Sequence, residues 1–310
     1  MSLHANLDRF YNLRVKDFQA TGDIRNFLKV APRVRCRQGN PATLVDYLGT
    51  LLAQPGVGAT RALVLGMWGE GWGSTDVTPT EAIELLVANK DKLPYVEAVF
   101  VGDIISEENE ISWIQNGDMS PIWSAFPNLR EFGVRGGNGL QLGKINHSSL
   151  KTLIIETGGL PVEVAREALA ANAPIEHLEL WFGDEQYGLT TKIGDLDDLL
   201  EGRIYPNLKT LALCNCPFAN EIAVRLAHSP LLARTEHLDL SLGTFGDAGA
   251  EALIRSGATA HLKSFDISHH YVSPSVRRRL AAATPNLIAG HAETAHVSDG
   301  ETSYYVMVSE

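Results

Sequence analysis

The chain has 310 residues, of which 26 are basic and 37 acidic, so its formal net charge is −11. Apolar residues make up 45% and charged residues 20%, a balance typical of a folded globular protein rather than a disordered one. The excess of acid argues against nucleic acid as a partner, because binding to phosphates needs a cationic surface. No apolar run approaches the ~20 residues that a membrane-spanning helix requires.

The sequence also bears on where the protein resides. The first residues, Met1–Asn12, lack the basic start and the apolar stretch of a secretory signal. The three cysteines, Cys36, Cys214 and Cys216, are too few for a disulfide scaffold. We therefore expect a cytoplasmic protein without a membrane anchor.

An apolar pattern, L-x-x-L-x-L, recurs along the chain and is its strongest structural signal. It is found at Thr60/Leu63/Leu65, Val96/Val99/Val101, Leu129/Phe132/Val134, Leu150/Leu153/Ile155, Ile175/Leu178/Leu180, Leu208/Leu211/Leu213, Thr235/Leu238/Leu240 and Leu262/Phe265/Ile267. From Leu129 onward the first positions lie 21, 25, 33, 27 and 27 residues apart. These intervals are close to the roughly 20–29 residues of a leucine-rich repeat.

Between these segments, apolar residues follow helical spacing, for example Val164-Ala165-Ala168-Leu169 and Ala250-Leu253-Ile254. We therefore predict an α/β fold, a leucine-rich repeat solenoid (horseshoe) with parallel strands on the concave face and helices on the convex face. The chain is expected to form a single domain, 1–310. Residues 1–57 would form an N-terminal cap, residues 58–291 about eight repeats, and residues 292–310 a C-terminal cap strand after a hairpin turn at Asp299-Gly300.

The segment Leu238–Leu240, followed by Gly246–Leu253, resembles ribonuclease-inhibitor-type leucine-rich repeats. The chain as a whole resembles a family of bacterial cytoplasmic leucine-rich repeat proteins, some of whose relatives are described alongside WGR domains. The stretches that carry this resemblance are Gly102–Ile104, Glu110–Ile114, Val134–Gly137, Glu156–Pro161, Leu178–Trp181 and His269–Tyr271. The resemblance implies the fold and a cytoplasmic location. It transfers no catalytic residue, because the family has no established activity.

The repeat register predicts which side chains reach the concave surface. Side chains alternate along a strand, so the third, fifth and seventh residues of each unit point away from the leucines. An acidic stripe, with an aromatic residue and two histidines beside it, is the kind of surface that contacts a partner. The predicted partner-binding residues are Glu131, Arg135, Glu156, His177, Glu179, Trp181, His237, Asp239 and Asp266. The alternative is that these strands simply carry solvated polar residues.

Other motifs are less specific. The loop Trp68–Gly73 is rich in glycine, which lets a backbone approach a ligand, but it also fits a plain strand-to-helix connection. The acidic run Glu107–Glu110 suits acid–base chemistry or a solvated helix start. His269-His270-Tyr271 lacks metal-ligand spacing, and Cys214-x-Cys216 is interpreted as structural rather than redox-active.

We therefore predict a non-catalytic scaffold that binds a protein partner, expected to be basic, on the concave face. No nucleophile–base pair or metal spacing is present, so no enzymatic activity, metal, cofactor or nucleic acid is expected. The alternative is a small-molecule-binding protein or an accessory enzyme subunit of a bacterial biosynthetic complex, which would use Trp68–Gly73 and Glu107–Glu110. The oligomeric state stays open.

Overall fold

The computed structural model describes residues 4–19, 22–37, 40, 42–69, 77–298 and 300–309. The chain divides into two compact units. Unit 1 comprises residues 1–155 and 170–173, and unit 2 comprises residues 156–169 and 174–309. In each unit, strands that are mostly parallel alternate with helices, so the protein is of the α/β class and is built from repeated strand–helix segments. The single continuous domain remains a prediction.

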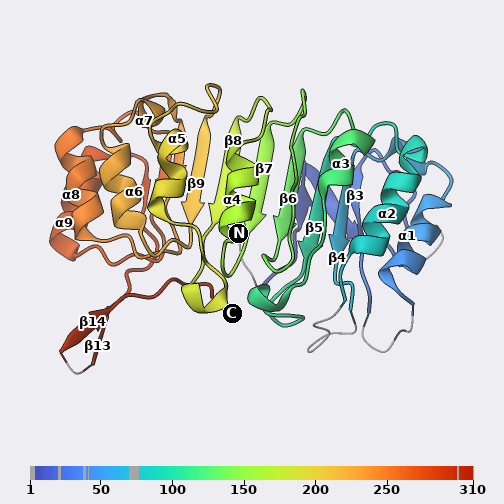
Figure 1. Ribbon diagram of the computed structural model, residues 1–310, viewed down its shortest axis with the longest axis horizontal. Coiled ribbons are helices and arrows are strands. Elements are labelled where there is room, and N and C mark those ends of the chain that lie inside the picture. The colour runs from blue at the N-terminus through green and yellow to red at the C-terminus, as the bar shows by residue number, and fades with distance from the viewer. Residues whose placement is uncertain are drawn as a thin grey trace. The chain divides into compact units, whose positions relative to one another are not determined.

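In unit 1 the strands lie side by side in chain order. They are β1 (Arg9–Phe10), β2 (Leu13–Asp17), β3 (Val30–Val34), β4 (Ala62–Gly66), β5 (Ala98–Asp103), β6 (Glu131–Arg135) and β7 (Thr152–Glu156). β1 pairs with β2 antiparallel, and the pairs from β2 to β6 are parallel. The helices α1 (Leu44–Leu52), α2 (Thr80–Ala88) and α3 (Ser120–Ala125) lie on one side of these strands (Figure 1). Short 3-10 turns are η1 (Val57–Ala59), η2 (Lys90–Lys92) and η3 (Ile111–Trp113).

In unit 2 the parallel strands are β8 (His177–Trp181), β9 (Thr210–Cys214), β10 (His237–Asp239), β11 (Ser264–Asp266) and β12 (Leu287–Ile288). The helices are α4 (Val162–Leu169), α5 (Asp197–Leu200), α6 (Ala219–Leu226), α7 (Pro230–Arg234), α8 (Asp247–Ser256) and α9 (Pro274–Ala283). The 3-10 turns are η4 (Glu185–Tyr187) and η5 (Ile193–Leu196). β13 (His296–Ser298) and β14 (Glu301–Ser303) form an antiparallel hairpin that extends away from the other strands of this unit (Figure 1).

The recurring apolar pattern explains where the strands form. In β8 and β9 the residues Leu178, Leu180, Leu211 and Leu213 are fully buried, as the pattern predicts. Because side chains alternate, these leucines pack under the helices while the residues between them point to the opposite face. The strand positions predicted from the repeat are therefore confirmed.

Both ends of the chain contain strands of their own. Residues 1–57 contribute β1, β2, β3 and α1, and β3 pairs in parallel with β4, so this segment continues the unit 1 sheet. The predicted hairpin near Gly300 is confirmed by the pairing of β13 with β14, although Asp299 lies outside the described residues. β14 ends at Ser303, and residues 304–309 form no strand.

The first residues cover the face of unit 1 that points away from its helices. A buried apolar cluster on that face consists of Phe10, Val15, Ala31, Ala62, Val64, Ala98 and Phe100. The rings of Phe10 and Phe100 meet edge to face, with centroids 5.8 Å apart. Phe100 also lies against Gly133 on the neighbouring β6, where a Cβ atom would come within 2.3 Å of the ring. This face of unit 1 is therefore a second small core.

A buried carboxylate holds this covering segment in place. Asp103, at the end of β5, has no exposed surface. Its Oδ1 accepts a hydrogen bond from the Leu7 backbone N–H at 3.1 Å, and its Oδ2 accepts one from Arg33 at 2.7 Å. Arg33 also pairs with Asp17 at 2.5 Å. The buried charges are thus compensated, as burial of an ion requires.

Candidate functional site

Two rows of side chains cross β8, β9, β10 and β11 on one face of unit 2. Glu179, Ala212, Asp239 and Asp266 are neighbours in register across these strands, and so are His177, Thr210, His237 and Ser264. Residues two apart on a strand point to the same side, so both rows share a face. We call Glu179, Asp239 and Asp266 the acid row.

The Glu179 carboxylate contacts two side chains of its own strand, β8. Its Oε1 accepts a hydrogen bond from the Trp181 indole at 2.8 Å, and its Oε2 lies 3.5 Å from His177 Nε2. Burial raises the pKa of the Glu179 carboxyl, but the hydrogen bonds and charge from His177 and the bond from Trp181 outweigh it. The pKa lies below its ordinary value, so Glu179 is ionised at neutral pH.

Asp239 and Asp266 occupy equivalent positions on adjacent strands. The Oδ1 of each accepts the backbone N–H two residues further on, from Ser241 and Ser268, at 2.8 Å in both cases. This local bond fixes each carboxylate at the end of its strand. In the part of the chain that the structure describes, no lysine or arginine forms an ion pair with either of them. Their negative charge is left uncompensated.

The pKa of Asp239 reflects this crowding. Burial raises it above its ordinary value, and the charges of Asp266 and Glu179 raise it further, while the hydrogen bonds from Ser241 lower it. A carboxyl whose pKa is shifted by burial and by neighbouring charges is a feature of many functional sites.

The remaining groups on this face have limited chemistry. His237 Nδ1 lies 2.8 Å from the Ser264 hydroxyl, which fixes its ring beside the acid row. Burial raises the pKa of the Cys214 thiol well above its ordinary value, and the Asp239 and Glu179 charges raise it further. Cys214 is therefore an unreactive thiol. Among the described residues no cluster of three His, Cys, Asp or Glu side chains could hold a metal ion.

The structure brings together five of the predicted partner-binding residues, namely His177, Glu179, His237, Asp239 and Asp266. Each is partly exposed. Glu131 is also partly exposed, but it begins β6 in unit 1.

The expectation that Arg135, Glu156 and Trp181 face solvent is wrong, because they are only 1%, 0% and 1% exposed. The Trp181 indole bonds to Glu179 instead of facing outward. The Arg135 guanidinium donates to the Ile104 carbonyl at 2.6 Å and lies 6.0 Å from the Phe100 ring. The repeat register shows which face a side chain takes, but not what covers that face.

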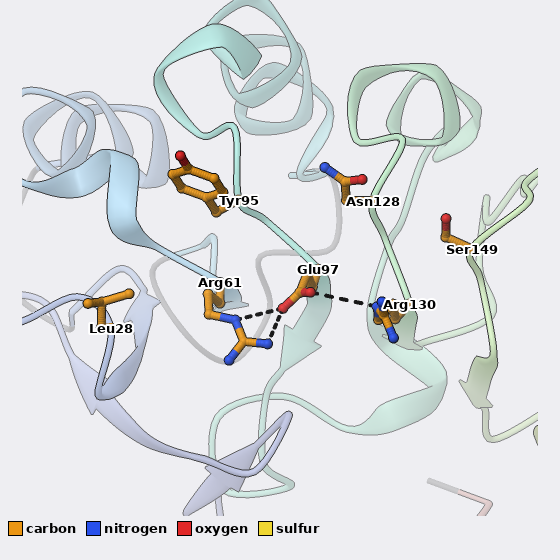
Figure 2. A pocket seen from close by; sticks show the side chains of 7 residues that line it. All are labelled: Leu28, Arg61, Tyr95, Glu97, Asn128, Arg130 and Ser149. Atoms are coloured by element: carbon orange, nitrogen blue, oxygen red, sulfur yellow. Dashed lines mark hydrogen bonds and ion pairs between the residues drawn. The ribbon is translucent and has the colours of Figure 1, made fainter.

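Sequence reasoning missed a cavity of about 320 Å³ in unit 1, lined by Leu28, Arg61, Tyr95, Glu97, Asn128, Arg130 and Ser149. Figure 2 shows Arg61 and Arg130 on either side of Glu97. Arg61 Nε donates to Glu97 Oε2 at 2.6 Å, and Arg130 Nε lies 3.6 Å from Oε1. These three residues each directly precede a strand, β4, β5 and β6. The sequence signal that could have revealed this cluster is the alternating sign of the charged residues directly before successive strands.

The motifs proposed for a ligand site do not line this cavity. Trp68 is buried and its indole donates to the Val77 carbonyl at 3.0 Å, while Glu70–Gly73 lie outside the described residues. In the acidic run, Glu108 pairs with Arg35, and Glu107 lies 3.4 Å from His4. The described part of this run therefore fastens neighbouring segments of unit 1.

Comparison with known proteins finds a similar fold among the solved structures. No protein-family model matches the chain, and no curated protein matches it. The crystal structure of a protein from Bacteroides fragilis is similar, with a TM-score of 0.78 and 28% sequence identity. The match covers 91% of this chain and 78% of that one. Within the described ranges, no helix has the length and apolar character needed to cross a membrane.

Proposed function

We propose that the strand face of unit 2 binds a protein partner through a positively charged segment. The acid row carries this proposal. Asp239 and Asp266 are paired in register on adjacent strands, whose backbones lie about 4.8 Å apart. Like charges placed directly opposite one another are destabilising. A partner cation would relieve that repulsion.

The geometry suits a lysine or arginine from the partner. A guanidinium is planar and presents several donors, so it can bond to both aspartates at once. Each aspartate accepts a backbone N–H with its Oδ1, and each remains partly exposed, so a partner can approach its carboxylate from solvent. Glu179 extends the negative surface two strands further. Complementary charge of this kind gives specificity and speeds association.

We also infer that both units belong to one leucine-rich repeat solenoid of the ribonuclease-inhibitor type, with the acid row on its concave face and a cytoplasmic location. The supporting observation is the repeat interval. β9, β10 and β11 begin at Thr210, His237 and Ser264, 27 residues apart, and helices lie between them. Solenoids of this class bind partners through the face that their strands line.

The test uses fluorescent octalysine as the probe and the full chain. The triple variant Glu179→Gln, Asp239→Asn, Asp266→Asn should bind it at least about tenfold more weakly at low salt, because three charges of one surface are removed. The matched control removes three exposed charges elsewhere in unit 2: Glu163→Gln, Glu221→Gln and Glu301→Gln. If both triple variants lose binding equally, the effect comes from net charge and the proposal fails.

A second candidate function is small-molecule binding in the cavity of Figure 2. The favouring observation is that two guanidiniums share a single carboxylate, so the cluster of Arg61, Glu97 and Arg130 has a net positive charge. Arg130 is the more loosely held and is about half exposed, with a side-chain exposure of 52%. A ligand bearing a carboxylate could bond to it.

This candidate is tested with benzoate, whose ring can contact Tyr95 and Leu28 at the cavity wall. Titration followed by calorimetry should show binding to the unmodified chain and at least about tenfold weaker binding to Arg130→Gln, because a charged hydrogen bond is lost. Equal binding by both proteins, or none by either, would rule the cavity out as a carboxylate site.

A further inference from the structure

Residues 304–308 lie across the loops that follow three successive strands of unit 2. The Asn215 side chain bonds to both backbone groups of Val308, donating to its carbonyl and accepting from its N–H at 2.9 Å. The Met307 N–H donates to the Leu242 carbonyl at 2.8 Å. The Tyr305 carbonyl accepts from the Tyr271 hydroxyl at 2.9 Å and lies 3.2 Å from His269 Nε2. We call residues 304–308 the docked segment.

The residues that receive this segment are equivalent positions of the repeat. Asn215, Leu242 and His269 are 27 residues apart, and their φ angles are 53°, 65° and 59°. A left-handed backbone is uncommon for residues other than glycine. Its recurrence at the same position of three loops shows that the three loops share one backbone conformation. The backbone N–H groups of Asn215 and Leu242 bond to the next loop at 2.8 Å, to Ser241 and Ser268. These bonds join the three loops into one continuous surface that receives the docked segment, and we call this surface the loop groove.

The length of the docked segment matches the spacing of the loops. From the loop of His269 to that of Asn215 there are two strand intervals, about 10 Å. From Tyr305 to Val308 there are three residues, which span about 10 Å when extended. An extended peptide of this length can therefore reach all three loops.

Alternate side chains of the segment enter the groove. Val306 and Val308 are buried, while Tyr305 and Met307 are exposed by 56% each. This alternation is that of an extended peptide whose backbone supplies hydrogen bonds and whose alternate side chains supply specificity. The two buried positions of the segment are thus both branched apolar residues, two residues apart.

The docked segment is joined to the unit by an exposed arm. Every residue of β13 is exposed, and β13 pairs only with β14 among the described strands. An isolated two-stranded hairpin is marginally stable in water. Val297 on this arm is 66% exposed, and Tyr304, Tyr305 and Met307 follow it, so the arm and segment present a run of uncovered apolar side chains.

We propose that the loop groove is a peptide-binding site for extended segments with branched apolar residues at alternate positions, and that in solution it takes the docked segment of a second copy of this chain. Each copy carries the peptide that fits the groove, so two copies can exchange arms and keep every contact described above. Exchange would also bring the exposed arms together and cover Val297 and Tyr304.

The first experiment tests the groove in the full chain. The double variant Val306→Asp, Val308→Asp releases the segment, because buried charges would be uncompensated. A fluorescent peptide of residues 302–309 should then bind to this variant with micromolar affinity. Adding Asn215→Ala should weaken binding by about tenfold or more, because two hydrogen bonds are lost. Met307→Asp, a charge at an exposed position, is the control and should leave the segment docked. A folded double variant that does not bind the peptide overturns the proposal.

The second experiment tests the source of the peptide. Two populations of the unmodified chain, labelled separately with donor and acceptor dyes on the arm, should develop energy transfer after mixing. Sedimentation should show a dimer that the double variant lacks. If the unmodified chain stays monomeric and exchanges no dye while the peptide binds to the double variant, the second copy is ruled out as the occupant.

Discussion

The strand faces of the two units follow the same repeat but have opposite character. In unit 1 the fifth position of the repeat holds Phe100 and Gly133, and the face is closed by residues 7–15. In unit 2 the same position holds Glu179, Asp239 and Asp266, and these side chains stay partly exposed. Both faces present the side chains that the leucine pattern leaves free.

This difference shows that the leucine repeat determines where the strands and helices form. The residues between the leucines determine whether the strand face is covered or exposed. An apolar fifth position makes a face that must be covered, since exposed apolar surface is unfavourable. An acidic fifth position makes a face that must stay in contact with water or a cation. The predictions below test the two faces, from the largest expected effect to the smallest.

Phe100→Ala should produce the largest loss. It removes a fully buried aromatic side chain from the centre of the unit 1 face, which costs about 4 kcal/mol of unfolding free energy. Denaturant unfolding measures the loss. Tyr95→Ala, which removes a side chain that is 64% exposed, is the control and should change stability little. A similar loss in both variants would contradict the view that this face is a second core.

Asp103→Ala should cost about 3 kcal/mol, because Arg33 would lose one of two carboxylates and the Leu7 N–H would lose its acceptor. Hydrogen exchange should rise selectively in residues 7–15, the segment that covers the face. Asp91→Ala, at an exposed position, is the control. Unchanged exchange in residues 7–15 would show that Asp103 does not anchor them.

Gly133→Ala should cost about 2 kcal/mol, because its Cβ would meet the Phe100 ring and force it to move. In the Phe100→Ala background the same substitution should cost much less, since the ring is absent. A double-mutant cycle measures this coupling. Additive effects would mean that the two residues do not contact each other in solution.

Asp239→Asn should have the smallest effect, and with the opposite sign. The folded chain raises the pKa of Asp239 above 3.8, so the folded state binds its proton more tightly than the unfolded state does. Stability contributed by this group therefore falls as the pH rises from 3.8 through the raised pKa. The variant should have a higher Tm than the unmodified chain at pH 7, and this gain should vanish below 3.8.

The control for that prediction is Glu163→Gln, at an exposed position on α4. Its Tm should follow that of the unmodified chain across the same pH range. A Tm for Asp239→Asn that is lower at pH 7 would show that the Asp239 carboxylate stabilises the fold, against the interpretation of the acid row as an uncompensated charge cluster.

Much of this protein is determined by local sequence. The leucine pattern placed β4 to β11, and the alternation of side chains identified Glu179, Asp239 and Asp266 as neighbours on one face. These features depend on residues that are close in sequence or equivalent in the repeat, which is why a single sequence reveals them.

Only the tertiary structure decided which of those side chains are accessible. The Leu7 N–H reaches Asp103 across 96 residues, and Asn215 reaches Val308 across 93. Such contacts have no period and leave no pattern in the sequence, because they depend on where a segment returns to the sheet. That is why the sequence did not show that residues 304–308 bond to the loops of unit 2 instead of forming a strand.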